Sequence, residues 1–412
     1  MTVTDTSILA EQALQQLFAD PASAKNPYPL YAQLRESAPV HRAGFLPVWV
    51  MSGYEECDRA FRHVAFGKRD ELTRGFGHDL ADDQTYAFMS KDSIVRQNPP
   101  DHTRLKGLIS REFTARRVSQ MRTRIEELAR ELLTGIDDHR DFDLMADLAF
   151  SLPVRVLGEL LGVPEAEQTQ FRALTVSITK LIDPSSTPDE VARGKADCLV
   201  MERYFLDLIA ARRRRPTDDL TTALIHVRDG EERITEDELL ATVMVLFFGG
   251  VETTTSVLGS AVLTLLEHPD QLAVLRSDRS QIPFAVDECL RYQSPTQATA
   301  RTVLEATTVN GIALAEGDVV LTMLGAANRD PRRYDEPERF DITRRGAHLA
   351  FAAGLHYCIG AALAKLEVEV ALEAILDRYT DLHLLDDEPH WRPNVTMRGL
   401  ETLRLAGEQA AR

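Results

Sequence analysis

One cysteine near the end of the chain stands in a setting suited to a metal-binding thiolate. Cys358 lies between Gly354 and Gly360, and a helical pattern over residues 359–379 begins just after it. Backbone N–H groups and the positive dipole at a helix N-terminus stabilise a nearby anion and lower the pKa of a thiol. The glycines let the backbone approach a flat, bulky cofactor. The alternative is a buried structural cysteine, the common fate of a free thiol.

A second group with chemical potential interrupts the long helix expected over residues 235–268. Gly249 and Gly250 are followed by Glu252 and Thr253. Glycines and β-branched residues weaken a helix interior, and a threonine hydroxyl that bonds to the i−4 carbonyl bends it. A bend opens a groove, where a carboxylate beside a hydroxyl can pass protons to a bound oxygen species. The alternative is a helix kinked for packing, with Glu252 merely exposed.

These residues resemble the motifs of the cytochrome P450 family. Phe351, Gly354, Cys358 and Gly360 match its haem-binding signature Phe-x-x-Gly-x-x-x-Cys-x-Gly, although Ala352 stands where the family often has glycine. The resemblance covers almost the whole chain. It implies a mainly α fold with minor β structure, in which haem b (iron protoporphyrin IX) lies between the long central helix and the loop that carries the cysteine ligand.

In the central helix the resemblance implies a site for oxygen. Gly249 and Gly250 would leave room for dioxygen, Thr253 would hold the oxygen species at the haem, and Glu252 would gate protons from solvent. The order along the chain agrees with this, because the cysteine loop follows about a hundred residues later.

Further polar residues match the family's motifs by their position. Glu288 and Arg291 are three residues apart on one helical face and match its Glu-x-x-Arg ion pair, which Arg339 would join to brace the haem-binding core. Four positions are implied as partners of the haem propionates, with lysine in place of the usual arginine at position 106: His102, Lys106, Arg301 and His356. For each of these four alone, a solvated surface residue is an equally good interpretation.

The substrate pocket is predicted from position relative to these motifs. The implied set is mostly apolar, as small-molecule pockets usually are, and for each member plain core packing is an equally good interpretation: Phe88, Met89, Ile94, Val95, Val245, Phe248, Gln297, Thr299, Thr396 and Met397. Phe248 is large for a position beside the oxygen groove, so we expect it to constrain which carbon of the substrate is oxidised.

The elements that must position these groups are mostly helical. We expect helices over residues 8–18, 101–133, 144–215 and 359–379 besides the central one, and an irregular loop over 70–100. A strand is expected at 48–51. Two further strands, Val309–Ile312 and Val319–Met323, are expected to pair through a turn at Gly317. No linker or repeat divides the 412 residues, so residues 1–412 are interpreted as one haem-thiolate monooxygenase domain.

Composition narrows the class of protein. The formal net charge of −17 argues against nucleic acid as a partner. Four cysteines without metal-ligand spacing suggest a reducing compartment. No signal peptide is recognised, and the most apolar segment, Val243–Val251, is shorter than the ~20 residues of a membrane helix. We therefore expect a cytoplasmic monomer without a membrane anchor.

The resemblance implies a monooxygenase that uses O₂ to hydroxylate or epoxidise a small, largely apolar molecule, in bacterial biosynthesis of polyketides, macrolides or terpenes. Electrons would come from NAD(P)H through a ferredoxin reductase and a ferredoxin, which would dock on basic residues such as Arg116 and Lys365. Two alternatives remain: a peroxide-driven haem-thiolate enzyme, and a haem-based sensor or carrier.

Overall fold

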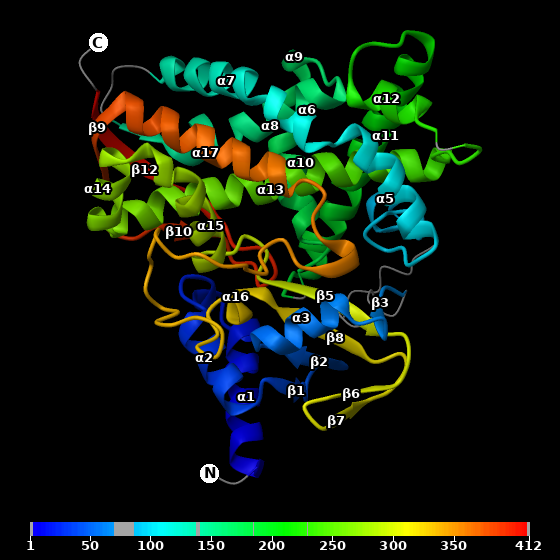
Figure 1. Cartoon of the computed structure of the whole chain (residues 1–412), viewed down its shortest axis with the longest axis vertical. Coiled ribbons are helices and arrows are strands. Elements are labelled where there is room, and N and C mark those ends of the chain that lie inside the picture. The colour runs from blue at the N-terminus through cyan, green and yellow to red at the C-terminus, as the bar shows by residue number, and fades with distance from the viewer. Residues whose placement is uncertain (1–2, 70–85, 137–140, 184, 229, 410–412) are drawn as a thin grey trace.

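The computed structural model describes all residues except 1–2, 70–85, 137–140, 184, 229 and 410–412. Helices dominate it (Figure 1). The α-helices are α1 Val3–Ala19, α2 Tyr28–Ser37, α3 Tyr54–Arg62, α5 Asp101–Glu112, α6 Ala115–Gln120, α7 Arg122–Gly135, α8 Ser151–Leu161, α9 Glu165–Gln168, α10 Phe171–Thr179, α11 Pro188–Arg214, α12 Leu220–His226, α13 Glu236–Glu267, α14 Pro269–Ser277, α15 Ile282–Tyr292, α16 Leu324–Ala327 and α17 Ala361–Arg378. Short 3₁₀ or π turns are η1 Pro21–Ala24, η2 Ala87–Met89, η3 Met145–Ala149, η4 Arg279–Gln281 and η5 Gly354–His356.

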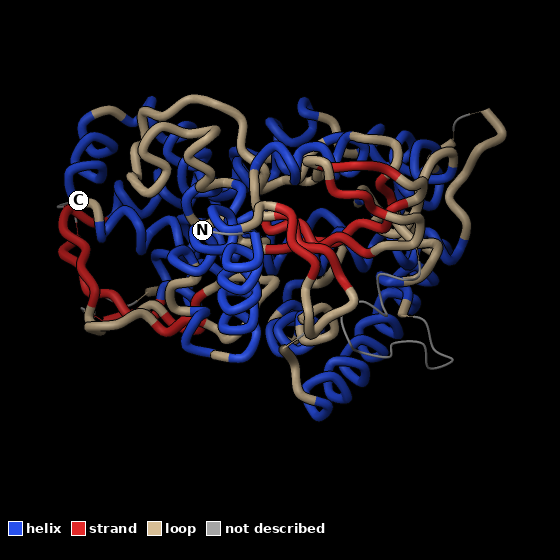
Figure 2. Tube along the Cα trace, turned by 90° about the horizontal axis from the view of Figure 1, so that it is seen from below, coloured by secondary structure: helices blue, strands red, loops and turns tan. Residues whose placement is uncertain are grey.

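The strands are short and form small sheets. They are β1 Val40–Arg42, β2 Val48–Met51, β3 Phe66–Gly67, β4 Asp141–Asp143, β5 Ala298–Val303, β6 Thr307–Val309, β7 Ile312–Leu314, β8 Val319–Met323, β9 Tyr379–Leu384, β10 His390–Trp391, β11 Leu400–Thr402 and β12 Arg404–Gln409. The largest sheet has the order β1-β2-β8-β5-β3. It lies with α1, α2 and α3 in the lower part of Figure 1, below most of the other helices. Figure 2 shows these strands gathered in one region, apart from the C-terminal strands.

Helix α13 is the central element, and its ends follow from the sequence. Thr235 and Glu238 form a capping box, in which the Glu238 N–H donates to Thr235 Oγ1 at 3.2 Å and the Thr235 N–H donates to Glu238 Oε2 at 2.9 Å. Contacts with α8, α11, α15 and α17 surround the helix. It is long and apolar enough to cross a membrane, but 72% of its most apolar stretch is buried inside the structure, as in a core helix.

Two expectations about the chain path need correction. The strand pair around residue 310 is wrong in detail: β6 pairs with β7 through Asn310-Gly311, which both adopt positive φ (50° and 78°), whereas β8 pairs with β2 and β5. Asn-Gly favours this tight hairpin turn, and Gly317, at φ 87°, instead lies in the turn between β7 and β8. Residues 70–85 of the expected loop lie outside the described residues, and 86–100 contain only η2 and turns.

Candidate active site

A cavity of about 320 Å³ lies between α13 and the loop that leads into α17. Cys358 lines it from the loop side, and apolar side chains such as Leu157, Leu246 and Leu290 make up much of the wall. The predicted site residues that line this cavity are Ile94, Val95, His102, Lys106, Val245, Gly249, Gly250, Thr253, Thr299, Phe351, His356, Cys358 and Gly360. Residues far apart in the sequence thus meet around one thiol.

The cysteine loop depends on tight backbone turns. Gly354 has φ 66°, and a Cβ atom there would lie 2.3 Å from the carbonyl oxygen of Phe61, so only glycine fits. Ala352 also adopts a left-handed conformation, with φ 55°. The backbone N–H of Cys358 donates to the Phe351 carbonyl at 3.2 Å. Together these contacts hold the sulfur at the entrance to α17.

The surroundings of the Cys358 sulfur call for a cation. Burial raises the pKa of the Cys358 thiol, while the N–H groups of Gly360 and Ala361 and the positive charge of Lys106 act in the opposite direction. Cys358 is exposed toward the cavity, and a thiolate there would gain further positive charge from a metal ion. The other three cysteines, Cys57, Cys198 and Cys289, are buried in the protein core, where burial raises the pKa of each thiol.

Beside the cavity lies a group of basic side chains that no described carboxylate neutralises. Arg301 is 3% exposed; its guanidinium donates to the Ala300 carbonyl at 2.9 Å and packs 4.7 Å from the ring centre of Phe61. Burial lowers the pKa of Arg301 to about 10. Within the described residues, no carboxylate forms an ion pair with Arg301, Lys106, His102 or His356.

The two histidines also lack partners among the described residues. Their rings lie 4.3 Å apart, and the buried atoms His102 Nδ1 and His356 Nε2 have no hydrogen-bond partner there. Burial, reinforced by nearby positive charges, lowers the pKa of His102 to about 4 and that of His356 to about 2. The cavity thus has a thiol on one wall and, beside it, cations and ring nitrogens without partners. These groups suit a flat metal complex that carries two carboxylates.

The Lys106 ammonium is already engaged by the cysteine loop. It donates to the carbonyls of Leu355 and Tyr357, the latter at 3.1 Å. Because Leu355 and Tyr357 flank His356 and precede Cys358, Lys106 ties α5 to the loop that carries the thiol.

The central helix presents Thr253 and Glu252 to different spaces. Thr253 lines the Cys358 cavity and donates its hydroxyl to the Gly249 carbonyl at 2.6 Å. Glu252 is 2% exposed and lines a separate cavity of about 820 Å³, where its carboxylate lies 2.5 Å from the Arg392 guanidinium. Glu252 is therefore neither exposed nor in the groove, contrary to the interpretations from sequence, because Arg392 holds it on the other side of α13.

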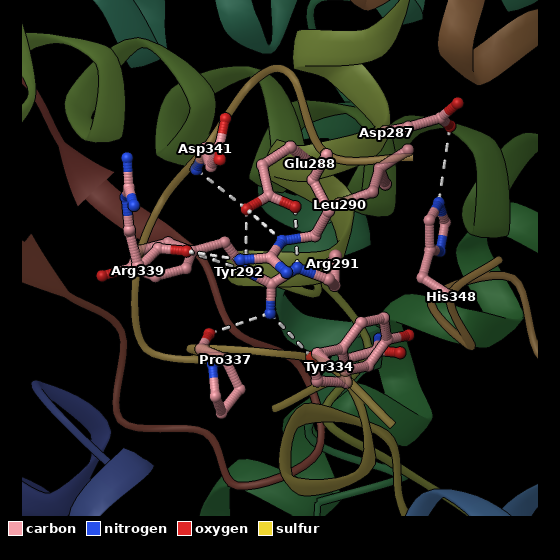
Figure 3. A network of polar contacts seen from close by, with 12 residues as sticks. Asp287, Glu288, Leu290, Arg291, Tyr292, Tyr334, Pro337, Arg339, Asp341 and His348 are labelled. Atoms are coloured by element: carbon pink, nitrogen blue, oxygen red, sulfur yellow. Dashed lines mark hydrogen bonds and ion pairs between the residues drawn. The ribbon is translucent and has the colours of Figure 1, made fainter. Parts of the chain in front are cut away.

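A buried ion-pair network joins α15 to the chain before the cysteine loop (Figure 3). Arg291 donates to both carboxylate oxygens of Glu288, at 2.7 and 2.8 Å, and both residues are 2% exposed. Arg291 also donates to the carbonyls of Asn328 and Pro337, each at 2.9 Å. Every charge of this pair is satisfied within the chain, which suits a structural brace.

The prediction that Arg339 completes this network is wrong. The Arg339 side chain is 60% exposed and pairs with Glu336, and only its backbone carbonyl accepts a bond from Arg291, at 3.3 Å. The third arginine is Arg344, whose Nε lies 3.3 Å from Glu288 Oε1. Spacing in the sequence could not distinguish the two, because the loop between Pro337 and Arg344 folds back on itself.

Part of the predicted substrate set lies elsewhere. Phe88 and Phe248 pack against each other at 5.4 Å, and Met89 packs on the same core. Gln297 and Met397 line two other cavities, and Thr396 donates to the Ile182 carbonyl at 3.3 Å. These three residues are not among the walls of the Cys358 cavity, but Met397 pairs with Thr296, which does line it, so their contact with substrate stays a prediction.

Several contributors to the site have no motif in the sequence. Glu367 is 1% exposed on α17 and lines the Cys358 cavity, and its Oε2 has no hydrogen-bond partner in the described part of the chain; burial raises its pKa well above the ordinary value. An acidic residue nine positions after the cysteine, among apolar residues of a helix, is the one signal that marks it. Arg392 and Arg344 reach the site through loops, whose path no local pattern predicts.

The fold and this thiol-bearing cavity define an enzyme built around a haem-like cofactor, and comparison with known proteins gives the family. The family model described as Cytochrome P450 matches residues 196–400. Cytochrome P450 107B1 of Saccharopolyspora erythraea is 39% identical over 398 residues, which cover 93% of this chain and 96% of that protein. The 6-deoxyerythronolide B hydroxylase of the same organism is 39% identical over 392 residues, covering 91% and 95%.

A solved structure agrees with the sequence relatives. The crystal structure of P450BioI in complex with hexadec-9Z-enoic acid ligated acyl carrier protein superposes with a TM-score of 0.88 at 34% identity, covering 95% of this chain and 100% of that chain. The chain belongs to the cytochrome P450 family. It is a monooxygenase whose cofactor is haem b, whose oxidant is O₂ and whose electrons come from NAD(P)H through redox partners, so the expected fold, enzyme class and cofactor are confirmed.

Proposed function

We propose that this enzyme hydroxylates or epoxidises a small, largely apolar product of bacterial secondary metabolism, of the polyketide, macrolide or terpene kind. The observation that carries the proposal is the cavity above Cys358, whose described lining on the side of α13 is apolar apart from threonine hydroxyls. A neutral, hydrophobic molecule is the ligand such a wall binds. A bacterial relative named 6-deoxyerythronolide B hydroxylase and a solved structure titled as the cytochrome P450 PksS of bacillaene polyketide synthase support the same class.

The cysteine loop is proposed as the proximal side of the cofactor site. Cys358 would supply the thiolate ligand, and Phe351, Gly354 and Gly360 would shape the loop around it. His102, Lys106, Arg301 and His356 would hold the two propionates, since these groups lack carboxylate partners in the described chain. When bound, a haem with a thiolate ligand supplies the oxygen-activating chemistry.

On the opposite side, α13 is proposed to control protons and space. Gly249 and Gly250 have no side chain and so leave space beside α13. A Cβ atom on Gly250 would lie 2.5 Å from Leu157 Cδ1. Thr253 Oγ1 holds a proton at the cavity, hydrogen-bonded to the Gly249 carbonyl. Glu252 takes up protons on the Arg392 side of the helix and passes them toward Thr253.

The substrate would lie against Ile94, Val95, Val245 and Thr299, which line the cavity with Cys358. The Phe88 and Phe248 rings, which pack against each other at a tilt of 48°, stand behind this wall and set its depth. Replacing Phe248 with alanine should therefore change which carbon is oxidised, and an unchanged product profile would argue against this role.

For electron supply, we propose a ferredoxin with its reductase, and for the enzyme a monomeric state in the cytoplasm. Arg116 is exposed beside α5 and α7, whereas Lys365 is partly engaged by Asp287 at 2.8 Å. Docking should therefore depend more on Arg116 than on Lys365. Electron-transfer rates that do not change with salt concentration or in Arg116→Glu would exclude this surface as the ferredoxin docking site.

The proposed reaction is tested by substrate binding followed by turnover. The ferric enzyme is titrated with a panel of macrolides, polyketide lactones, terpenes and, as controls, charged metabolites of similar size. We expect spin-state changes in the absorption spectrum only with apolar compounds, and incorporation of one atom of isotopically labelled dioxygen into the product. Tight binding confined to charged compounds would overturn the proposed substrate class.

A further inference from the structure

Lys68 carries a positive charge beside the proposed propionate site without an evident reason in the protein's own structure. It follows strand β3, which pairs antiparallel with β5 so that Gly67 faces Thr302. Continuing this register places Lys68 opposite Arg301. Like charges directly opposite each other destabilise a strand pair, so this arrangement needs a compensating anion.

Hydrogen bonds hold Lys68 both at its backbone and at its ammonium group. Asn98 grips the Lys68 backbone: its Oδ1 accepts from the Lys68 N–H at 2.9 Å, and its Nδ2 donates to the Lys68 carbonyl at 2.6 Å. The ammonium donates to the Ala300 carbonyl at 2.8 Å. That carbonyl also accepts a hydrogen bond from the Arg301 guanidinium at 2.9 Å, so the two cations share one acceptor.

The charges around Lys68 are also positive. Burial, together with the charges of Arg301 and Arg96, lowers the pKa of Lys68 well below its ordinary value. In the part of the chain that the structure describes, no carboxylate pairs with Lys68, and its ammonium uses one of three donors. A lysine that served only to staple β3 to β5 would not need to stand next to Arg301.

We propose that Lys68 is a further cofactor-binding residue, which donates to a haem propionate together with Arg301. The inference rests on the proposed haem site but not on the proposed substrate. The propionate carboxylates would occupy the free donors of Lys68 and would remove the repulsion between the two cations.

The test compares Lys68→Met holoenzyme with Lys91→Met, which removes an exposed lysine from the next described segment. Haem transfer to excess apomyoglobin should be about tenfold faster in Lys68→Met, the loss expected for one charge-assisted hydrogen bond, and unchanged in Lys91→Met. The propionate-bending bands of the resonance Raman spectrum should shift in Lys68→Met only. The reduced, carbon monoxide-bound spectrum should stay of the thiolate type, which separates this result from a failure at Cys358.

The Raman bands decide the outcome. Faster haem loss with unchanged propionate bands would mark Lys68 as a structural residue and overturn the inference, as would no change in either measurement. If Lys68→Met does not accumulate as folded holoenzyme, Lys68→Arg is used, because it keeps the charge but moves the donors. Its propionate bands should shift while its rate of haem transfer stays within a few-fold of the unaltered enzyme, and bands identical to those of the unaltered enzyme would overturn the inference.

Discussion

Two buried arginines, ten residues apart, differ in the partners that the protein gives their guanidinium groups. Arg291 is 2% exposed and is satisfied by the Glu288 carboxylate and three backbone carbonyls. Arg301 is 3% exposed, and within the described residues its guanidinium has one hydrogen-bond acceptor, the Ala300 carbonyl. The first arrangement closes on itself and stabilises the fold. The second is complete only with an anionic ligand, so the state of pairing separates the brace from the cofactor site.

The largest effect is expected at the closed network. Glu288→Ala leaves Arg291 and Arg344 without their carboxylate and should lower the free energy of unfolding by about 3–5 kcal/mol, because a buried charge loses its partner. The denaturant concentration at the midpoint of unfolding and the haem content should both fall. The matched control is Glu336→Ala, which removes an exposed partner of Arg339 and should cost below about 1 kcal/mol. A stable, fully haem-loaded Glu288→Ala enzyme would refute the bracing role.

The second prediction concerns the open arrangement. Arg301→Met should speed haem loss by about tenfold to a hundredfold, the range of one charge-assisted hydrogen bond. Denaturant unfolding under conditions that keep the haem bound should change far less than in Arg291→Met. Haem transfer and unfolding are measured on both variants. The distinction fails if the two variants lose stability equally and release haem at the same rate.

A pair of buried carboxyl groups extends the comparison. Glu288 is paired, whereas Glu367 has no ionic partner in the described chain and its pKa is raised by burial. A carboxyl whose folded pKa lies above its unfolded pKa is more favourable to folding when protonated, so its cost appears as the pH rises above the unfolded value. Glu367→Gln should therefore stabilise the enzyme at neutral pH and not at low pH. Unfolding curves across pH with no gain at neutrality would contradict this.

The smallest expected effect lies in the cysteine loop. Ala352 adopts φ 55°, which costs an L-residue about 1 kcal/mol but costs glycine little. Ala352→Gly should therefore raise the free energy of unfolding by about 0.5 kcal/mol after the entropy lost by glycine is counted. Ala353→Gly is the control, because Ala353 is extended (φ −152°) and should only lose stability. Equal losses in both variants would remove the claim of strain.

Much of the fold and part of the site could be predicted because they are encoded locally. The capping box before α13, the glycine-bracketed Cys358 and the Glu288–Arg291 spacing each lie within a few residues of sequence. Arg344 in place of Arg339, and Arg392 against Glu252, depend on loops that return from elsewhere. No period or cap records such a path, so position along the chain was the only guide. It selected Arg339 wrongly and gave no sign of Arg392.

Strand pairing shows the same limit, with one avoidable error. The Asn310-Gly311 dipeptide is a strong hairpin signal, and it correctly explains why β6 pairs with β7. Pairing of β8 with β2, across a gap of about 270 residues, follows from tertiary packing that a single sequence does not display. The substrate wall is equally non-local, because segments as far apart in the sequence as Ile94, Val245 and Thr299 line one cavity.

The central claim is that Cys358 provides the thiolate on which the cofactor site is built. It is tested most directly by the absorption spectrum of the reduced, carbon monoxide-bound enzyme, measured for the unaltered chain and for Cys358→Ala. We predict a thiolate-type Soret band in the first and its complete loss in the second. A purified protein without haem, or a thiolate-type band that persists after Cys358→Ala, would contradict the account.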